Sequence, residues 1–204
     1  MPKYKERERQ RREEEILKVA ANLINQRGYA ELNMDHIAEQ VGVSKPTLYQ
    51  HFKSKDELVI GVMRQSSLAM EAHMAEVEAL SPLAQLETIL RYLLMSHVDA
   101  EAFPATLVIK DSFHTLDSFR DVLDDLDRIG NRIFALVIEG QQRGEITEDI
   151  SPSLIASSLF AVLGLLRTPN ELESAIPDGL ELSTPDEARV EEIVQFYIRG
   201  IKAQ

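Results

Sequence analysis

Residues 36 to 58, HIAEQVGVSKPTLYQHFKSKDEL, predict two short helices joined by a tight glycine turn. Asn33 is a suitable N-cap for a first helix that begins at Met34. Gly42 ends this helix, because a residue just past a helix C-terminus often needs a positive φ, which glycine adopts at almost no steric cost. The apolar residues of the first helix have the spacing of one buried face: Ile37, Ala38 and Val41.

A second, more polar helix is expected directly after the turn. Val43 can return to the core, and Ser44 can cap the helix that follows. Lys45 and Pro46 lie in its first turn, where the N–H that proline lacks would have no partner within the helix. The residues expected to face inward are Leu48 and Phe52, and those left outside are Lys45, Thr47, Tyr49, Gln50 and His51. The pattern predicts a helix-turn-helix with a polar second helix.

These residues carry a resemblance: the stretch resembles the DNA-binding segment of TetR-type transcriptional regulators. The matching positions, about a quarter of the chain with their surroundings, are Gly28-Tyr29, Ile37-Ala38, Gly42-Val43-Ser44, Thr47-Leu48-Tyr49, His51-Phe52, Lys55 and Leu58. The resemblance implies an all-α fold in which a helix over residues 12–27 packs across the pair. It further implies a helix-turn-helix DNA-binding domain over residues 1–55, with three helices. An all-helical ligand-binding and dimerisation domain would follow over residues 56–204.

Position by position, the resemblance implies that the second motif helix faces the major groove of double-stranded DNA. Base edges would lie against Lys45, Pro46, Thr47, Gln50 and His51, and phosphates against Tyr49 and Lys55. Lysine and glutamine can bond base edges, and threonine and proline can contact a thymine methyl group. The candidate DNA-binding residues are Asn33, Lys45, Pro46, Thr47, Tyr49, Gln50, His51 and Lys55. Asp35 is acidic, so we expect it to cap or to accept from cytosine, and not to touch phosphate.

A structural interpretation competes with DNA binding. Tyr49 and Phe52 would then be core aromatics, and Lys53 and Lys55 a solvated surface. The glycine turn, the two caps and the apolar spacing agree with one another, which favours DNA binding. His36 is expected to be a packed or capping residue rather than a ligand.

Charge is divided unevenly along the chain. Residues 1–55 hold 11 Lys and Arg against 8 Asp and Glu, a net of +3, and the other 149 residues hold 11 against 26, a net of −15. An acidic body would repel phosphate everywhere except at the basic end. Within that end, a run of cations interrupted by glutamates fits either a flexible arm in a minor groove or a salt-bridged extension of the first helix: Lys3, Lys5, Arg7, Arg9, Arg11 and Arg12.

Composition excludes several classes of protein. The 204 residues, 44% hydrophobic and 27% charged, can bury one large core or two modest ones. The sequence has no run of 18 apolar residues and nothing that resembles a signal peptide, so we expect a cytoplasmic location. With zero cysteines, it has neither a disulfide framework nor a thiolate nucleophile. Phosphate-loop, nucleophile-elbow and HExxH motifs are absent, so we predict no enzyme activity, no catalytic residue, no cofactor and no metal site.

The remaining sequence is helical almost without interruption. Its expected boundaries are a capping box at Ser54-Lys55-Asp56-Glu57, a helix end near Ala79, a start at Ser81-Pro82, a break at Phe103-Pro104, a short helix to Phe113 and an amphipathic stretch from Phe119 to Gly144. The helix after Ser54 would join the two domains. No alternating strand pattern occurs.

Two later segments have the pattern of partner helices. Residues 152–167 combine leucine and isoleucine with small residues, which let helices approach closely. Residues 185–202 start at a Thr184-x-x-Glu187 capping box with Pro185 in the first position. Both apolar stripes also fit the core of a monomer. The resemblance implies that these two helices pair with their copies in a homodimer, which spaces two recognition helices on an operator.

The resemblance also implies a mostly apolar cavity for a small-molecule effector that releases a repressor from its operator. The candidate ligand-binding residues are Tyr92, Met95, Phe103, Phe113, His114, Phe134, Phe160 and Leu163. For each of them, packing in the core is the more common role. The alternative is a DNA-bound adaptor of the same fold, which recruits a protein partner and has no small-molecule effector.

Overall fold

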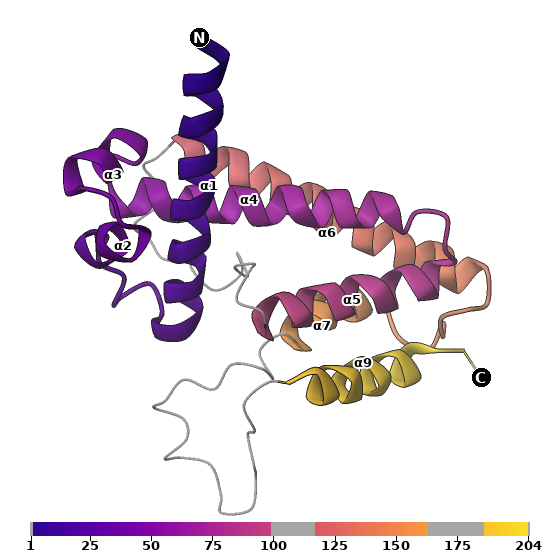
Figure 1. Ribbon diagram of the computed structural model, residues 1–204. Coiled ribbons are helices and arrows are strands. Elements are labelled where there is room, and N and C mark those ends of the chain that lie inside the picture. The colour runs from indigo at the N-terminus through magenta and orange to yellow at the C-terminus, as the bar shows by residue number, and fades with distance from the viewer. Residues whose placement is uncertain (1, 99–116, 163–185, 204) are drawn as a thin grey trace, which may run out of the picture. The chain divides into compact units, whose positions relative to one another are not determined.

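The structure is a computed structural model that describes residues 2–98, 117–162 and 186–203 of the chain (Figure 1). All regular elements in these ranges are helices, and the one β-type contact is an isolated antiparallel bridge between Ile146 and Lys202. The all-α class is therefore confirmed. Within the same ranges, no helix is both long and apolar enough to span a bilayer.

The described helices pack into two compact units. The first contains the residues up to Ala69 and the start of α6 up to Leu126, and the second contains the other described residues. Helix α4 (Lys55–Glu76) and helix α6 (Asp117–Gln142) each contribute to both units. The domain boundary at residue 55 stays a prediction.

The first unit is built on α1 (Pro2–Arg27), α2 (Met34–Val41) and α3 (Lys45–His51). The helix boundaries of the motif are confirmed at each end. Asn33 Oδ1 accepts a hydrogen bond from the Asp35 amide at 2.8 Å, and Ser44 caps α3. Gly42 has φ of 73°, and the amide of Val43 donates to the carbonyl of Ala38 at 2.9 Å, which completes a Schellman-type helix end.

The inner side of the motif packs on α1 and α4. Leu48 and Phe52 are buried in the core of the first unit, as the sequence predicted. Gly61 of α4 allows a close approach, because a Cβ there would lie 3.0 Å from both Leu17 Cδ2 and Phe52 Cε1. The end of α3 is thus held against a rigid support.

The N-terminal basic run is helical, since α1 begins at Pro2. Arg11 pairs with Glu8 at 3.2 Å, and Arg12 pairs with Glu15 at 2.8 Å. Of the two possibilities that the sequence left open, the salt-bridged extension of the first helix is the one observed.

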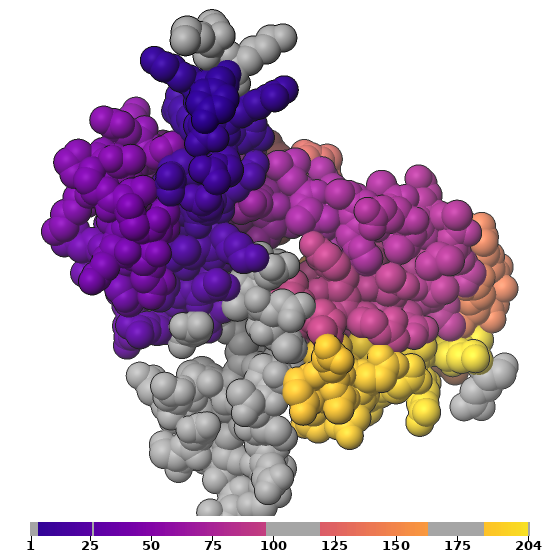
Figure 2. All heavy atoms as spheres, in the orientation of Figure 1, coloured from indigo at the N-terminus to yellow at the C-terminus, as the bar shows by residue number. Residues whose placement is uncertain are grey.

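The second unit is organised around α5 (Pro82–Val98) and α9 (Glu187–Ile201), which lie side by side (Figure 1). Helix α7 (Pro152–Val162) also packs on α9, and the Tyr197 hydroxyl donates to the carbonyl of Ile155 at 2.5 Å. The other side of α9 is exposed and carries Phe196, and Figure 2 shows α9 in yellow at the surface. This unit is therefore packed through one side of α9 only, as far as the described residues extend.

Two predicted helix limits are wrong. Helix α9 begins at Glu187, two residues after the predicted start, and is capped by Asp186, whose carboxylate accepts from the Arg189 amide at 2.8 Å. Helix α4 ends at Glu76, three residues before the predicted end. The Phe103-Pro104 break and the residues of 152–167 beyond Val162 lie outside the described residues.

Candidate nucleic-acid interface

Helix α3 presents a polar face that is supported by a buried one. Lys45, Pro46, Tyr49 and Gln50 are exposed, whereas Leu48 is fully buried. Tyr49 is 47% exposed although it is aromatic, so it is not a core residue. The exposed positions follow the helical period, which brings a lysine, an amide and a phenol to one surface.

Thr47 is half-buried and takes part in the cap of its own helix. Its hydroxyl lies 2.7 Å from the Ser44 hydroxyl, and its amide donates to Ser44 Oγ at 3.3 Å. The Thr47 hydroxyl therefore already has a hydrogen-bond partner, which leaves its methyl group as the part suited to a thymine contact.

Lys45 forms an ion pair that was not predicted from the sequence. Its Nζ donates to Asp35 Oδ2 at 2.5 Å, which joins the first turn of α3 to the first turn of α2. Asp35 was expected to cap or to contact cytosine. Its amide is instead bonded to the Asn33 cap, and its carboxylate neutralises the lysine.

His51 is not on the outside of α3, contrary to the prediction. Its side chain is 9% exposed, and its Nδ1 lies 3.7 Å from Glu13 Oε2 of α1. Nδ1 is buried without a hydrogen-bond partner. The ring thus faces α1 at the end of the recognition helix, so it braces the helix and is turned away from the exposed face.

Lys55 is half-buried at the start of α4. Its Nζ lies 4.2 Å from the centre of the Tyr29 ring and donates to the carbonyl of Ala30 at 3.3 Å. The Tyr29 hydroxyl donates to Asp56, and burial, followed by this hydrogen bond, raises the pKa of Tyr29 to about 12. The cluster ties the turn after α1 to the start of α4.

Asn33 and His36, at the start of α2, both have partners within the same helix. Asn33 is exposed and caps α2 through its side-chain oxygen. His36 is half-buried, and its Nε2 lies 3.3 Å from Gln40 Nε2. His36 is therefore a packed residue of the helix, as expected.

The predicted ligand-binding residues do not share one environment. Tyr92 stacks on His73, with ring centres 4.3 Å apart and an angle of 16° between the planes. Met95 and Phe160 pack against the core of the second unit, and Phe134 is exposed on α6. The other candidates lie outside the described residues: Phe103, Phe113, His114 and Leu163.

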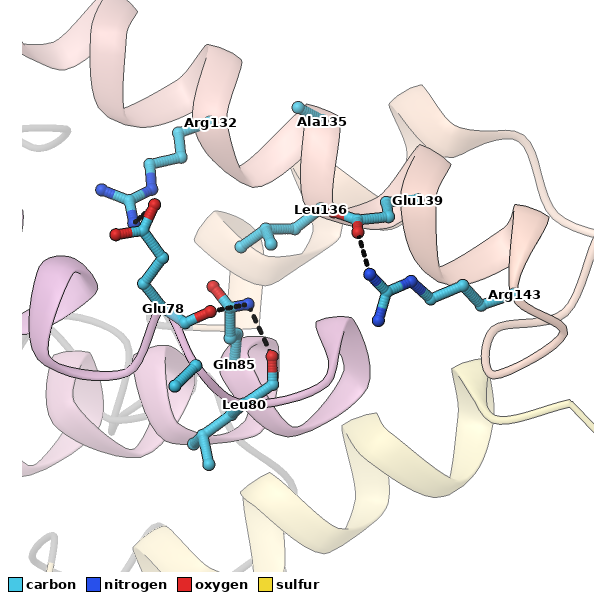
Figure 3. Close-up of a pocket in the computed structure, with 9 residues that line it drawn as sticks. Glu78, Leu80, Gln85, Arg132, Ala135, Leu136, Glu139 and Arg143 are labelled. Carbon is cyan, nitrogen blue, oxygen red and sulfur yellow. Dashed lines mark hydrogen bonds and ion pairs between the residues drawn. The ribbon is translucent and has the colours of Figure 1, made fainter.

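A pocket of about 440 Å³ opens between the turn after α4, helix α5 and helix α6 in the second unit (Figure 3). Its lining residues are Glu78, Ala79, Leu80, Gln85, Arg132, Ala135, Leu136, Glu139 and Arg143. Arg143 pairs with Glu139 at 2.5 Å, and Gln85 donates to the carbonyl of Leu80 at 2.9 Å. None of the predicted ligand residues lines this pocket. Its rim is polar, in contrast to the apolar cavity that the sequence analysis expected.

Helix α3 is capped, one of its sides is buried, and its other side is exposed and polar. This arrangement defines a helix-turn-helix DNA-binding protein. Comparison with known sequences extends this. The profile of the bacterial regulatory proteins of the tetR family matches residues 16–62.

Individual relatives agree with that match. The transcriptional activator FasR of Mycolicibacterium smegmatis is 46% identical over 57 residues, which cover 28% of this chain and 26% of FasR. The transcriptional repressor AcnR of Corynebacterium diphtheriae is 28% identical over 168 residues, which cover 80% of this chain and 83% of AcnR. The structure of AibR in complex with isovaleryl coenzyme A and operator DNA superposes with a TM-score of 0.69 at 20% identity, covering 94% of this chain and 98% of that one.

Residues 16–62 therefore match the TetR family of bacterial regulatory proteins, and the likenesses together support a TetR-type regulator. It is a regulator and not an enzyme, in line with the names of its relatives. The match to FasR is confined to about a quarter of that protein.

Proposed function

We propose that the protein is a dimeric repressor whose α3 lies in the major groove of its operator. The observation that carries this proposal is the exposed face of α3 on a buried support. Lys45 and Gln50 are the donors for base edges, and Tyr49 donates to a phosphate. Pro46 offers an apolar contact to a thymine methyl group.

The remaining candidates receive different roles. Asn33 acts through the cap of α2, and its exposed amide lies at the N-terminus of that helix, where a phosphate is favoured. Lys55 adds positive charge close to phosphate while its ammonium group lies over the Tyr29 ring. His51 braces α3 against Glu13 instead of contacting a base.

A homodimer through α7 and α9 would place two such helices on one operator. Phe196 of α9 and Leu154 of α7 are large apolar side chains exposed on the isolated chain. Ser157 and Ala161 lie on the same face of α7 as Leu154, and these small side chains permit close approach of a partner helix. A two-fold axis would bury this surface twice.

We further propose that a small-molecule effector releases the repressor from its operator. The effector would bind to the second unit and would change DNA binding through α4. Helix α4 contributes to both units, and Arg128 of α6 holds its second half through Glu71 at 3.0 Å. Tyr92, Met95, Phe134 and Phe160 are the described candidates for its contacts, and the remaining candidates are Phe103, Phe113, His114 and Leu163. AibR holds both a coenzyme A thioester and operator DNA, which supports this arrangement by analogy. Coupling of about 1 to 3 kcal/mol would change operator affinity by roughly 5- to 150-fold.

Selection of bound fragments from a random pool of duplexes tests the DNA proposal. We expect an inverted repeat whose half-sites are separated by about one helical turn or a multiple of it. Affinity for the selected sequence should fall as salt rises. A protein without any salt-sensitive preference among duplexes would contradict the proposal.

The effector is tested on the selected operator. The low-molecular-mass fraction of a bacterial extract should release the protein from this duplex, whereas the same fraction should not act on an unrelated repressor. If the complex persists and only a protein fraction alters it, the adaptor function is supported instead. An operator in the chromosome also implies a cytoplasmic location for the protein.

A further inference from the structure

We propose that Asp35 determines specificity by holding the Lys45 ammonium for a base edge and keeping it from the phosphate backbone. This inference rests on the proposed function, since it concerns how α3 uses one of its donors. The two side chains belong to different helices, and their ion pair spans 2.5 Å from Nζ to Oδ2. Both are more than half exposed, at 62% for Lys45 and 53% for Asp35.

The backbone of Asp35 is held by the cap of α2, and its side chain is much shorter than that of Lys45. Asp35 lies in the first turn of α2, where the helix dipole favours a negative charge, and its amide is bonded to the Asn33 cap. Lys45 lies in the first turn of α3, where the dipole disfavours a positive charge. Asp35 therefore supplies the compensation that Lys45 needs at that position, and gives a flexible side chain one preferred direction.

The pair still leaves Lys45 able to bind DNA. A lysine ammonium has three N–H donors, and Asp35 accepts one of them. The other two can reach guanine O6 and N7, which are neutral acceptors. The geometry of the pair thus orients the lysine without consuming it.

The same pair disfavours phosphate. A phosphate that approached the ammonium would also approach the Asp35 carboxylate, and like charges at such distances repel. A base edge carries no net charge and meets no comparable repulsion. Asp35 would therefore reduce the affinity for every duplex while it increases the difference between right and wrong base pairs.

Glu39 provides a matched control on the same helix. It lies four residues after Asp35, hence on the same face of α2, and it is also exposed. In the described part of the chain, Glu39 forms no ion pair with Lys45. Glu39→Gln therefore removes one negative charge from the DNA side of α2 without releasing the lysine.

The experiment compares Asp35→Asn, Glu39→Gln, Lys45→Ala and the double variant Asp35→Asn/Lys45→Ala in the full-length protein. Fluorescence anisotropy measures binding to the selected operator, to operators with single base-pair changes and to a random duplex, over a range of salt. Thermal melting of each variant confirms that it is folded at the temperature of the assay.

We expect Lys45→Ala to abolish discrimination at one base pair. In the wild type, the affinity for the right base pair there should exceed that for a wrong one by about 5-fold or more. Asp35→Asn should lower discrimination at that same base pair by about threefold. On random duplex, the slope of the logarithm of the binding constant against the logarithm of the salt concentration should become steeper by about 0.9, because Lys45 gains a phosphate contact. Glu39→Gln should tighten random binding but leave the discrimination intact. In the Lys45→Ala background, Asp35→Asn should have no effect on discrimination.

The inference is overturned if Asp35→Asn and Glu39→Gln change discrimination equally, or if Asp35→Asn acts equally with and without Lys45. It is also overturned if the Lys45→Ala variant discriminates at every base pair as strongly as the wild type does. Each of these results leaves sequence-specific binding by the wild type in place. Loss of the proposed function would differ, because the wild type itself would then show no preferred duplex.

Discussion

Phe196 is the residue whose replacement tests the dimer most directly. It lies on α9 and is 73% exposed, whereas its neighbours Tyr197 and Ile198 are buried in the second unit. Phe196→Ala removes a ring that contributes little to the isolated chain. In a dimer through α7 and α9, the same ring would be buried in both protomers.

The size of the effect follows from the exposed fraction. Burying a phenylalanine side chain completely contributes about 1.5 to 3 kcal/mol. The 73% that remains exposed on one chain then corresponds to about 1 to 2 kcal/mol on dimerisation. A two-fold interface contains the residue twice, so Phe196→Ala should cost about 2 to 4 kcal/mol, or roughly 30- to 1,000-fold in the dimer dissociation constant.

Sedimentation equilibrium over a range of protein concentrations measures this constant. Leu68→Ala is the control, because Leu68 is an exposed leucine of α4, outside the two proposed interface helices. Its replacement should leave the dissociation constant unchanged. The reasoning is refuted if Phe196→Ala dimerises like the wild type, or if both variants weaken the dimer equally.

Three further outcomes are expected. Gly42→Ala should lower the free energy of unfolding by about 1 to 2 kcal/mol, because alanine is strained at a φ of 73°, and unchanged urea denaturation would contradict this. Tyr49→Ala should weaken binding about 10-fold or more to all duplexes alike, since a phosphate contact carries no sequence information, and a loss confined to one base pair would argue against that role. Burial, and then the bond to Asp56, raises the pKa of Tyr29 from 10.0 to about 12. This residue therefore stabilises the fold below pH 10 and loses that contribution as pH rises through about 12. Urea denaturation at about pH 9 and about pH 11 should show a smaller loss of stability for Tyr29→Phe than for the wild type, and equal losses would exclude the linkage.

The local structure of the motif could be predicted because each signal acts within a few residues. Asn33 and Ser44 bond amides two or three positions away, and Gly42 adopts its φ without reference to the rest of the fold. The apolar spacing then identifies the buried face of each helix. The structure confirmed the predicted helix-turn-helix, including its two N-caps.

The orientation of side chains at the edge of that face could not be predicted in the same way. His51 lies four residues after Thr47 and three after Leu48, hence between the exposed and the buried side of α3. Glu13 on α1 decides the outcome, and it is 38 positions away in sequence. The partner of Lys45 was missed for a related reason, because Asp35 comes within reach only once the glycine turn has brought α2 and α3 together.

Ion pairing changes what the charge count implies about DNA binding. The first 55 residues carry a net charge of +3, but several of their cations are already paired, including Arg11 and Arg12 with glutamates and Lys45 with Asp35. A cation that keeps its carboxylate partner neutralises no phosphate, so it releases no counterion from the duplex. General attraction to DNA is therefore weaker than the count suggests, and under the proposed function the choice of operator would depend on the few exposed donors of α3. The ion pairs near the motif thus lower the affinity for all sequences. When this general affinity is low, the contacts of one lysine and one glutamine can make a large difference between the operator and other sequences.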